Sequence, residues 1–166
     1  MLTSLVGSEM CIRDSCKTAS LIANSTRAAG VLSGCSPDQL DSLYQFGRQL
    51  GLAFQVVDDI LDFTGSDQQL GKPAASDLAS GYLTAPTFYA MEEHPGLQPL
   101  IAREFSQDGD LGKALDMVRS SRAIPRTREL AETFAREARE AISWLSDSPS
   151  KSALLELPDF VLSRLY

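Results

Sequence analysis

Most positions between Gly51 and Thr64 are apolar, and the polar ones recur at a fixed interval. The stretch reads GLAFQVVDDILDFT, and its polar residues fall at i, i+3, i+4 and i+7, the spacing of one face of an α-helix. An ordinary surface helix has a narrow apolar stripe and a broad polar face. Here the proportions are inverted. We expect a helix buried on most sides, with a narrow polar stripe formed by Gln55, Asp58, Asp59 and Asp62.

The helical pattern extends over most of the remaining chain. Ser36-Pro37-Asp38-Gln39 combines an N-cap serine, a proline at the first helical position and a glutamine three residues after the cap, so it predicts a helix that starts here and runs to Thr64. Gly34 suits the left-handed position after the preceding helix. Residues 65–81 read as a loop. Further helices are expected over 17–34, 82–93, 97–105, 111–121, 126–145 and 150–166.

The fold class follows from what the pattern lacks. No segment shows the sustained alternation of apolar and polar residues that is typical of strands, so the chain is predicted to be all-α. Residues 1–15, MLTSLVGSEMCIRDS, carry no helical period and no signal-peptide pattern. We interpret them as a non-native junction sequence, with the native N-terminal part of the protein missing.

Composition narrows the function classes. The 166 residues carry a formal charge of −7 and scattered basic residues, which argues against nucleic acid or an anionic membrane as the main partner. No stretch approaches the ~18 consecutive apolar residues of a membrane span. Cys11, Cys16 and Cys35 form neither a disulfide framework nor a zinc pattern, so a reducing compartment fits best.

Three carboxylates on a buried stripe need compensation, because they repel one another and burial disfavours their charged form. A hard divalent cation such as magnesium or calcium would supply it through oxygen ligands. Two alternatives stay open: a thin solvated acidic face, and pairing with lysines of a neighbouring helix. Lys17 and Lys72 are candidate cations, and lysines across a cavity from a metal-loaded carboxylate cluster would form a receptor for a polyphosphate.

At this point the residues resemble a known family. FQVVDDILDFTG, preceded by KTASLIANSTRAAGVLSG and followed by LGKPAASDL, is similar to the second half of trans-polyprenyl diphosphate synthases. The segments REFSQDGDLGKAL, SSRAIPRTRELAETFAREA and DFVLSRLY look closest to solanesyl diphosphate synthases of cyanobacteria and plastids. The resemblance implies that residues 16–166 are the C-terminal part of a polyprenyl synthetase domain, an isoprenoid-synthase-type helical bundle.

The resemblance also implies roles for individual residues. Asp58, Asp59 and Asp62 match the family's second aspartate-rich motif, which holds Mg²⁺ beside the allylic diphosphate, with Asp58 as the foremost direct ligand. Lys17 and Lys72 match lysines that contact this diphosphate. Polar residues that face the reacting end of the allylic chain are matched by Thr18 and Gln55.

The implied reaction ionises an allylic prenyl diphosphate, adds the cation to isopentenyl diphosphate and removes a proton. The full-length enzyme is expected to be a homodimer, located in the plastid stroma if eukaryotic and in the cytoplasm if bacterial. The family's first aspartate-rich motif has no counterpart in residues 1–16, so this chain alone is expected to be inactive. Alternatives are a class I terpene cyclase and a non-catalytic partner subunit of a heteromeric prenyl synthase.

Overall fold

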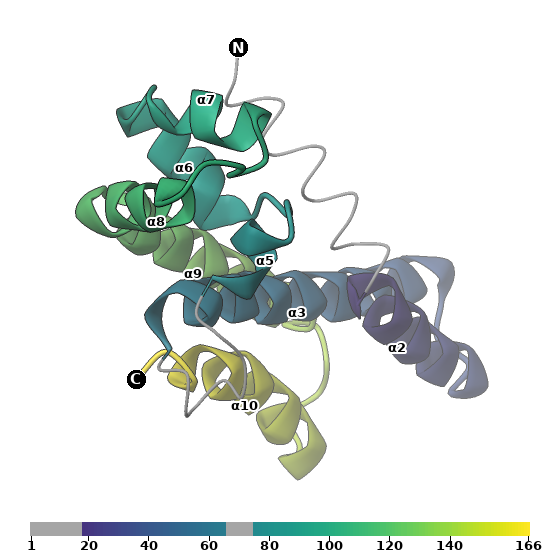
Figure 1. Ribbon diagram of the computed structural model, residues 1–166. Coiled ribbons are helices and arrows are strands. Elements are labelled where there is room, and N and C mark those ends of the chain that lie inside the picture. Colours follow the sequence, from purple (N-terminus) through teal and green to yellow (C-terminus); the bar gives the residue numbers. More distant parts are fainter. Residues whose placement is uncertain (1–17, 66–74) are drawn as a thin grey trace. The chain divides into compact units, whose positions relative to one another are not determined.

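The computed structural model describes residues 18–65 and 75–166, and the secondary structure in these ranges is helical (Figure 1). The prediction of an all-α fold is confirmed. The interpretation of residues 1–15 falls outside the described residues and stays a prediction. The helices are α2 (Ser20–Leu32), α3 (Pro37–Thr64), α5 (Ser76–Ala79), α6 (Ala85–Glu93), α7 (Leu97–Ala102), α8 (Asp110–Ser120), α9 (Ala123–Ala141) and α10 (Pro149–Ser163).

Helix α3 has the bounds that its sequence signals predict. The backbone N–H of Ser36 donates to Oε1 of Gln39 at 2.9 Å, and the backbone N–H of Gln39 donates to Oγ of Ser36 at 3.4 Å. This reciprocal pair is a capping box, which satisfies two backbone donors at the helix start. Gly34 has φ 73°, as expected for the residue that ends the preceding helix. The helix then continues for 28 residues, to Thr64.

The chain divides into two compact units, and the divisions fall inside α3 and α9. The first unit contains α2 and α3 up to Val57, together with residues 130–166. Its α2 and α3 form an antiparallel hairpin. Gly47 approaches the backbone of Ala23, and the Thr26 hydroxyl donates to the carbonyl oxygen of Leu43 at 2.7 Å. Small residues at these positions let the two helix backbones come close together.

The rest of the first unit joins α9 and α10 to this hairpin. Gln49 of α3 donates a 2.7 Å hydrogen bond to Glu137 of α9, and Arg139 of α9 pairs with Asp159 of α10. Lys151 donates to the carbonyl oxygen of Leu145 at 2.6 Å, just beyond the end of α9. The ammonium group of Lys151 thereby satisfies a backbone acceptor in the turn that follows the helix.

The second unit comprises residues 58–129, of which 58–65 and 75–129 are described. Helices α6, α7 and α8 pack against one another in this unit (Figure 1). They share a continuous apolar core to which the last turn of α3 and the short helix α5 also contribute. Its buried members are Phe63, Ala75, Leu78, Ala90, Leu97, Leu100, Ala114, Val118 and Ala123.

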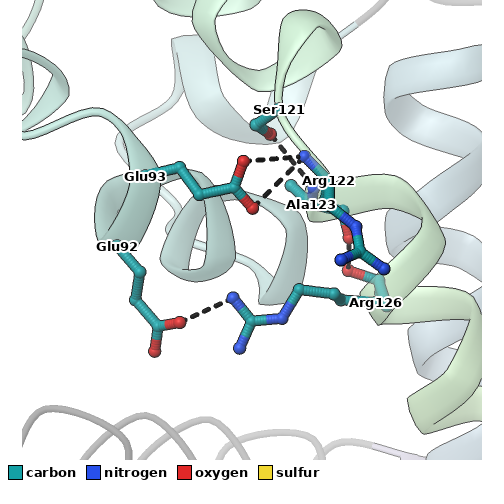
Figure 2. A network of polar contacts seen from close by, with 7 residues as sticks. Glu92, Glu93, Ser121, Arg122, Ala123 and Arg126 are labelled. Atoms are coloured by element: carbon teal, nitrogen blue, oxygen red, sulfur yellow. Dashed lines mark hydrogen bonds and ion pairs between the residues drawn. The ribbon is translucent and has the colours of Figure 1, made fainter.

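Helix α9 begins earlier than its sequence suggested. We expected a start at Arg126, after Pro125, but the helix starts at Ala123. Proline is tolerated in a first turn, because the N–H that it lacks has no partner within the helix. The exposed donors are satisfied from elsewhere: the backbone N–H of Arg122 donates to the Glu93 carboxylate, at 3.0 Å to Oε2 (Figure 2).

Further contacts stabilise the start of α9 and its junction with α6. Oγ of Ser121 accepts a 3.0 Å hydrogen bond from the backbone N–H of Ala123. Arg126 donates to Glu92 at 2.6 Å, as Figure 2 shows, and its guanidinium carbon lies 4.2 Å from the centre of the Tyr89 ring. The start of α9 is therefore set by residues of α6, about 30 positions earlier in the chain.

Two other sequence expectations need correction. The segment 65–81, expected to be a loop, contains the four-residue helix α5. Helix α7, expected to reach Phe105, ends at Ala102. Glu104 and Phe105 adopt φ values of 54° and 53°, which a continuing helix cannot accommodate. Arg103, the C-cap residue of α7, instead pairs with the buried Asp110 at the start of α8.

No helix in the described ranges combines the length and the apolar character that a membrane crossing requires.

Candidate functional site

Helix α3 is buried along most of its second half, as predicted. Its apolar residues from Leu50 to Phe63 are enclosed, apart from the half-buried Phe54 and Leu61. The polar stripe is enclosed as well: Asp59 is 6 % exposed, Asp62 is 2 % exposed and Gln55 is also buried. A solvated acidic face therefore does not describe Asp59 or Asp62. Asp58 is half-buried, which makes it the most accessible carboxylate of the three.

The carboxylate of Asp62 is held in place by the start of α5. Oγ of Ser76 donates to Oδ1 of Asp62 at 3.1 Å, and the backbone N–H of Asp77 donates to Oδ2 at 3.2 Å. The backbone N–H of Ala75 also donates to the main-chain oxygen of Asp62 at 2.7 Å. These hydrogen bonds restrict the rotation of the Asp62 carboxylate. Sequence reasoning placed 75–77 in a loop and missed this support, although Ser-Asp is a common way to begin a helix.

Thr18 and Gln55, to which the resemblance assigned a common role, contact each other directly. The Thr18 hydroxyl donates a 2.6 Å hydrogen bond to Oε1 of Gln55. Because the amide oxygen is engaged by Thr18, the amide nitrogen with its two donors is directed away from it. The hydrogen bond between Thr18 and Gln55 is possible because Gly51, one turn before Gln55 on α3, lies close to Ala19. A Cβ atom on Gly51 would lie 2.5 Å from Cα of Ala19.

The two candidate lysines, Lys17 and Lys72, lie outside the described residues, so their predicted contact with a diphosphate stays a prediction. Within residues 18–65 and 75–166, no group of three or more His, Cys, Asp or Glu side chains forms a metal cage of its own. The donor chemistry on α3 still suits magnesium, which usually takes one or two protein carboxylates and fills its remaining positions with phosphate oxygens and water. Asp58 and Asp62 stand one helical turn apart on α3 and offer such carboxylates.

A second polar centre lies at the junction of α7 and α8. Arg103 donates to both carboxylate oxygens of Asp110, at 2.7 and 2.6 Å, and the backbone N–H of Gln107 donates to the same group at 3.2 Å. The hydrogen bonds from Arg103, with the bond from Gln107, lower the pKa of Asp110 below its usual range even though burial opposes the charge. The pair closes the turn between two helices, and we assign it a structural role.

Comparison with known proteins places these features in a family. The family model described as polyprenyl synthetase matches residues 11–118. A prenyl transferase of Synechocystis is 57 % identical over 150 residues, which is 90 % of this chain and 46 % of that protein. Chloroplastic solanesyl-diphosphate synthase 2 of Oryza sativa subsp. japonica is 47 % identical over 149 residues, covering 90 % of this chain and 37 % of the rice protein.

Solved structures give the same result. An Arabidopsis medium/long-chain length prenyl pyrophosphate synthase in its apo form superposes with a TM-score of 0.80 at 40 % identity, over 90 % of this chain and 52 % of that one. Heptaprenyl diphosphate synthase of Staphylococcus aureus superposes with a TM-score of 0.88 at 31 % identity, over 95 % and 50 %. The chain thus spans less than half the length of the two curated relatives. It belongs to the polyprenyl synthetase family.

Proposed function

We propose that this chain provides the magnesium- and allylic-diphosphate-binding part of a trans-polyprenyl diphosphate synthase. The full-length protein would condense an allylic prenyl diphosphate with isopentenyl diphosphate. In this reaction the allylic carbon–oxygen bond breaks, pyrophosphate leaves with the bonding electrons, a carbon–carbon bond forms to isopentenyl diphosphate, and a proton is lost. The product is proposed to be a long-chain polyprenyl diphosphate, in line with the names of the solanesyl and hexaprenyl relatives.

The observation that carries most weight is the burial of Asp59 and Asp62 on α3, with the Asp62 carboxylate fixed by Ser76 and Asp77. Keeping charged carboxylates buried is costly unless a cation or hydrogen bonds compensate. Asp58, Asp59 and Asp62 would hold Mg²⁺ together with diphosphate oxygens. When bound, the metal would supply positive charge beside the departing pyrophosphate.

The remaining site residues would act on the substrate. Lys17 and Lys72 would bind the diphosphate as point charges. Thr18 orients the Gln55 amide, so its donors are fixed before the substrate arrives. Donors that are preorganised in this way would stabilise the negative charge that develops on the departing pyrophosphate, without reorganising during the reaction.

The oligomeric state and the compartment of the full-length protein are further parts of this proposal. We propose that the full-length protein is a homodimer, and that it acts in the plastid stroma if the source is eukaryotic and in the cytoplasm if it is bacterial. Rice solanesyl-diphosphate synthase 2 and Arabidopsis solanesyl diphosphate synthase 1 are chloroplastic by name, which supports the first location, whereas rice solanesyl-diphosphate synthase 1 is mitochondrial by name.

The test uses the full-length protein that contains this chain, assayed with isopentenyl diphosphate and an allylic diphosphate over a range of Mg²⁺ concentrations. Asp58→Ala should lower kcat by roughly 10²-fold or more, the scale seen when a group that stabilises transition-state charge is removed. Asp41→Ala is the matched control, because Asp41 lies on the same helix with its side chain 70 % exposed. Unchanged kinetics in Asp58→Ala, or a wild-type protein without condensation activity, would contradict the proposal.

A further inference from the structure

Arg164, the residue that follows α10, contacts α3. The guanidinium carbon of Arg164 lies 4.7 Å from the centre of the Phe54 ring, which is within the range of a cation–π contact. Both residues are half-buried and belong to the same unit. Val161, one turn earlier on α10, is buried and anchors this end of the helix.

Phe54 immediately precedes Gln55 in the turn of α3 that also contains Gly51. Residues from the beginning of the described chain contact this turn: Ala19 lies against Gly51, and Thr18 donates to Gln55. Arg164 contacts the same turn through Phe54. The position of the Gln55 backbone is therefore constrained by residues from both ends of the described sequence.

Packing against the Phe54 ring does not by itself require the guanidinium of Arg164. An apolar side chain could cover the Phe54 ring without the desolvation cost that a partly buried cation carries. Arginine adds a planar group that stacks on the ring in a defined orientation and donates hydrogen bonds at its edge. Its contribution is to set the geometry of the α3 turn in addition to filling space.

We propose that Arg164 is a positioning residue for prenyl transfer, acting through Phe54 on the turn that presents Gln55 to the allylic substrate. This inference rests on the proposed function. A shift of Gln55 by a fraction of an ångström would misplace its amide donors relative to the departing pyrophosphate at the reacting end of the substrate, and reaction rates are sensitive to displacements of this size.

A double-mutant cycle on the full-length protein tests the coupling, with kcat, the KM of the allylic diphosphate and the thermal midpoint measured for each variant. Arg164→Met should lower kcat roughly tenfold, and Phe54→Leu should lower it comparably. The double variant should be no slower than the slower single variant, because both changes break the same contact. Arg164→Lys should recover part of the rate, since an ammonium group can also lie over a ring.

Arg136→Met is the control, because Arg136 is an exposed arginine of α9 that pairs only loosely with Glu140, at 3.5 Å, and it should leave kcat unchanged. A wild-type kcat in Arg164→Met, even with a lowered thermal midpoint, would reduce the contact to a structural one and overturn the inference. Additive losses in the double variant would do the same. If Arg164→Met does not fold, Phe54→Leu with and without Arg164→Lys gives the coupling. An inactive wild-type protein would instead refute the proposed function itself, and this inference with it.

Discussion

The Thr18 hydroxyl donates a 2.6 Å hydrogen bond to Oε1 of Gln55, which lies 37 positions further along the chain. Thr18 stands just before α2, and Gln55 stands in the second half of α3. The bond leaves the amide nitrogen of a buried glutamine pointing away from Thr18. It thereby selects one of the two orientations that the amide group could otherwise adopt.

Thr18→Val in the full-length protein removes this bond and keeps the side-chain shape. A neutral hydrogen bond contributes about 1 kcal/mol. If this amount is lost from the stabilisation of the transition state, kcat with the allylic substrate should fall about fivefold. Thr18→Ser keeps the hydroxyl and should stay close to the wild type. Steady-state kinetics of the three proteins measures the effect. Equal rates for the valine and serine variants would show that the hydroxyl does not orient Gln55.

Gly51 is predicted to be intolerant of even one added carbon atom. A Cβ there would lie 2.5 Å from the Cα atom of Ala19, a backbone atom that cannot move aside without separating α2 from α3. Gly51→Ala should therefore reduce the free energy of unfolding by about 1–3 kcal/mol, the usual cost of overpacking a core. Urea denaturation of the variant and the wild type measures the difference.

The matched control is Gly112→Ala. Gly112 also lies inside a helix, α8, but nothing stands within 4 Å of an added Cβ. Alanine should raise the free energy of unfolding by about 0.5–1 kcal/mol, because it lowers the entropy of the unfolded chain without a clash. If both glycine variants changed stability in the same direction, the close approach at Gly51 would not be what selects glycine.

The Arg103–Asp110 pair predicts a pH dependence of stability. Hydrogen bonds from Arg103 lower the pKa of Asp110 in the folded protein, whereas in the unfolded chain it is about 3.9. Between the folded and the unfolded pKa of Asp110, the unfolded state binds more protons than the folded state, so stability rises with pH. The stabilisation by the pair is complete above the unfolded pKa and is lost as the pH falls through the lower, folded value.

Asp110→Asn should therefore be less stable than the wild type at pH 7, and the difference should shrink as the pH falls from about 5 to below 3.9. Thermal unfolding of both proteins at several pH values measures the stability difference and its dependence on pH. Asp108→Asn, at an exposed position two residues earlier, should show no such convergence. A constant difference between Asp110→Asn and the wild type across this range would contradict the assignment.

The order of helices and the identity of the family could be predicted from the sequence because their signals are local. The capping box of Ser36 and Gln39, the glycine at 34 and the periodicity of α3 involve residues within one or two turns of each other. Motif residues on a single helix, such as Gln55 and the three aspartates, share a stripe as soon as the helix forms. These features can be recognised without knowing how the rest of the chain packs.

Tertiary structure decided the features that join distant residues. Helix α9 starts at Ala123 because Glu93 and Ser121 satisfy donors around its first turn, and no pattern near Pro125 indicates this. The support of Asp62 by Ser76 depends on how the chain returns after α3. Local propensity determines which segments become helices, whereas the partners of a buried polar group depend on which segments pack together. The helices and the motif can therefore be predicted from the local sequence, whereas tertiary packing determines which atoms support the side chains of the motif.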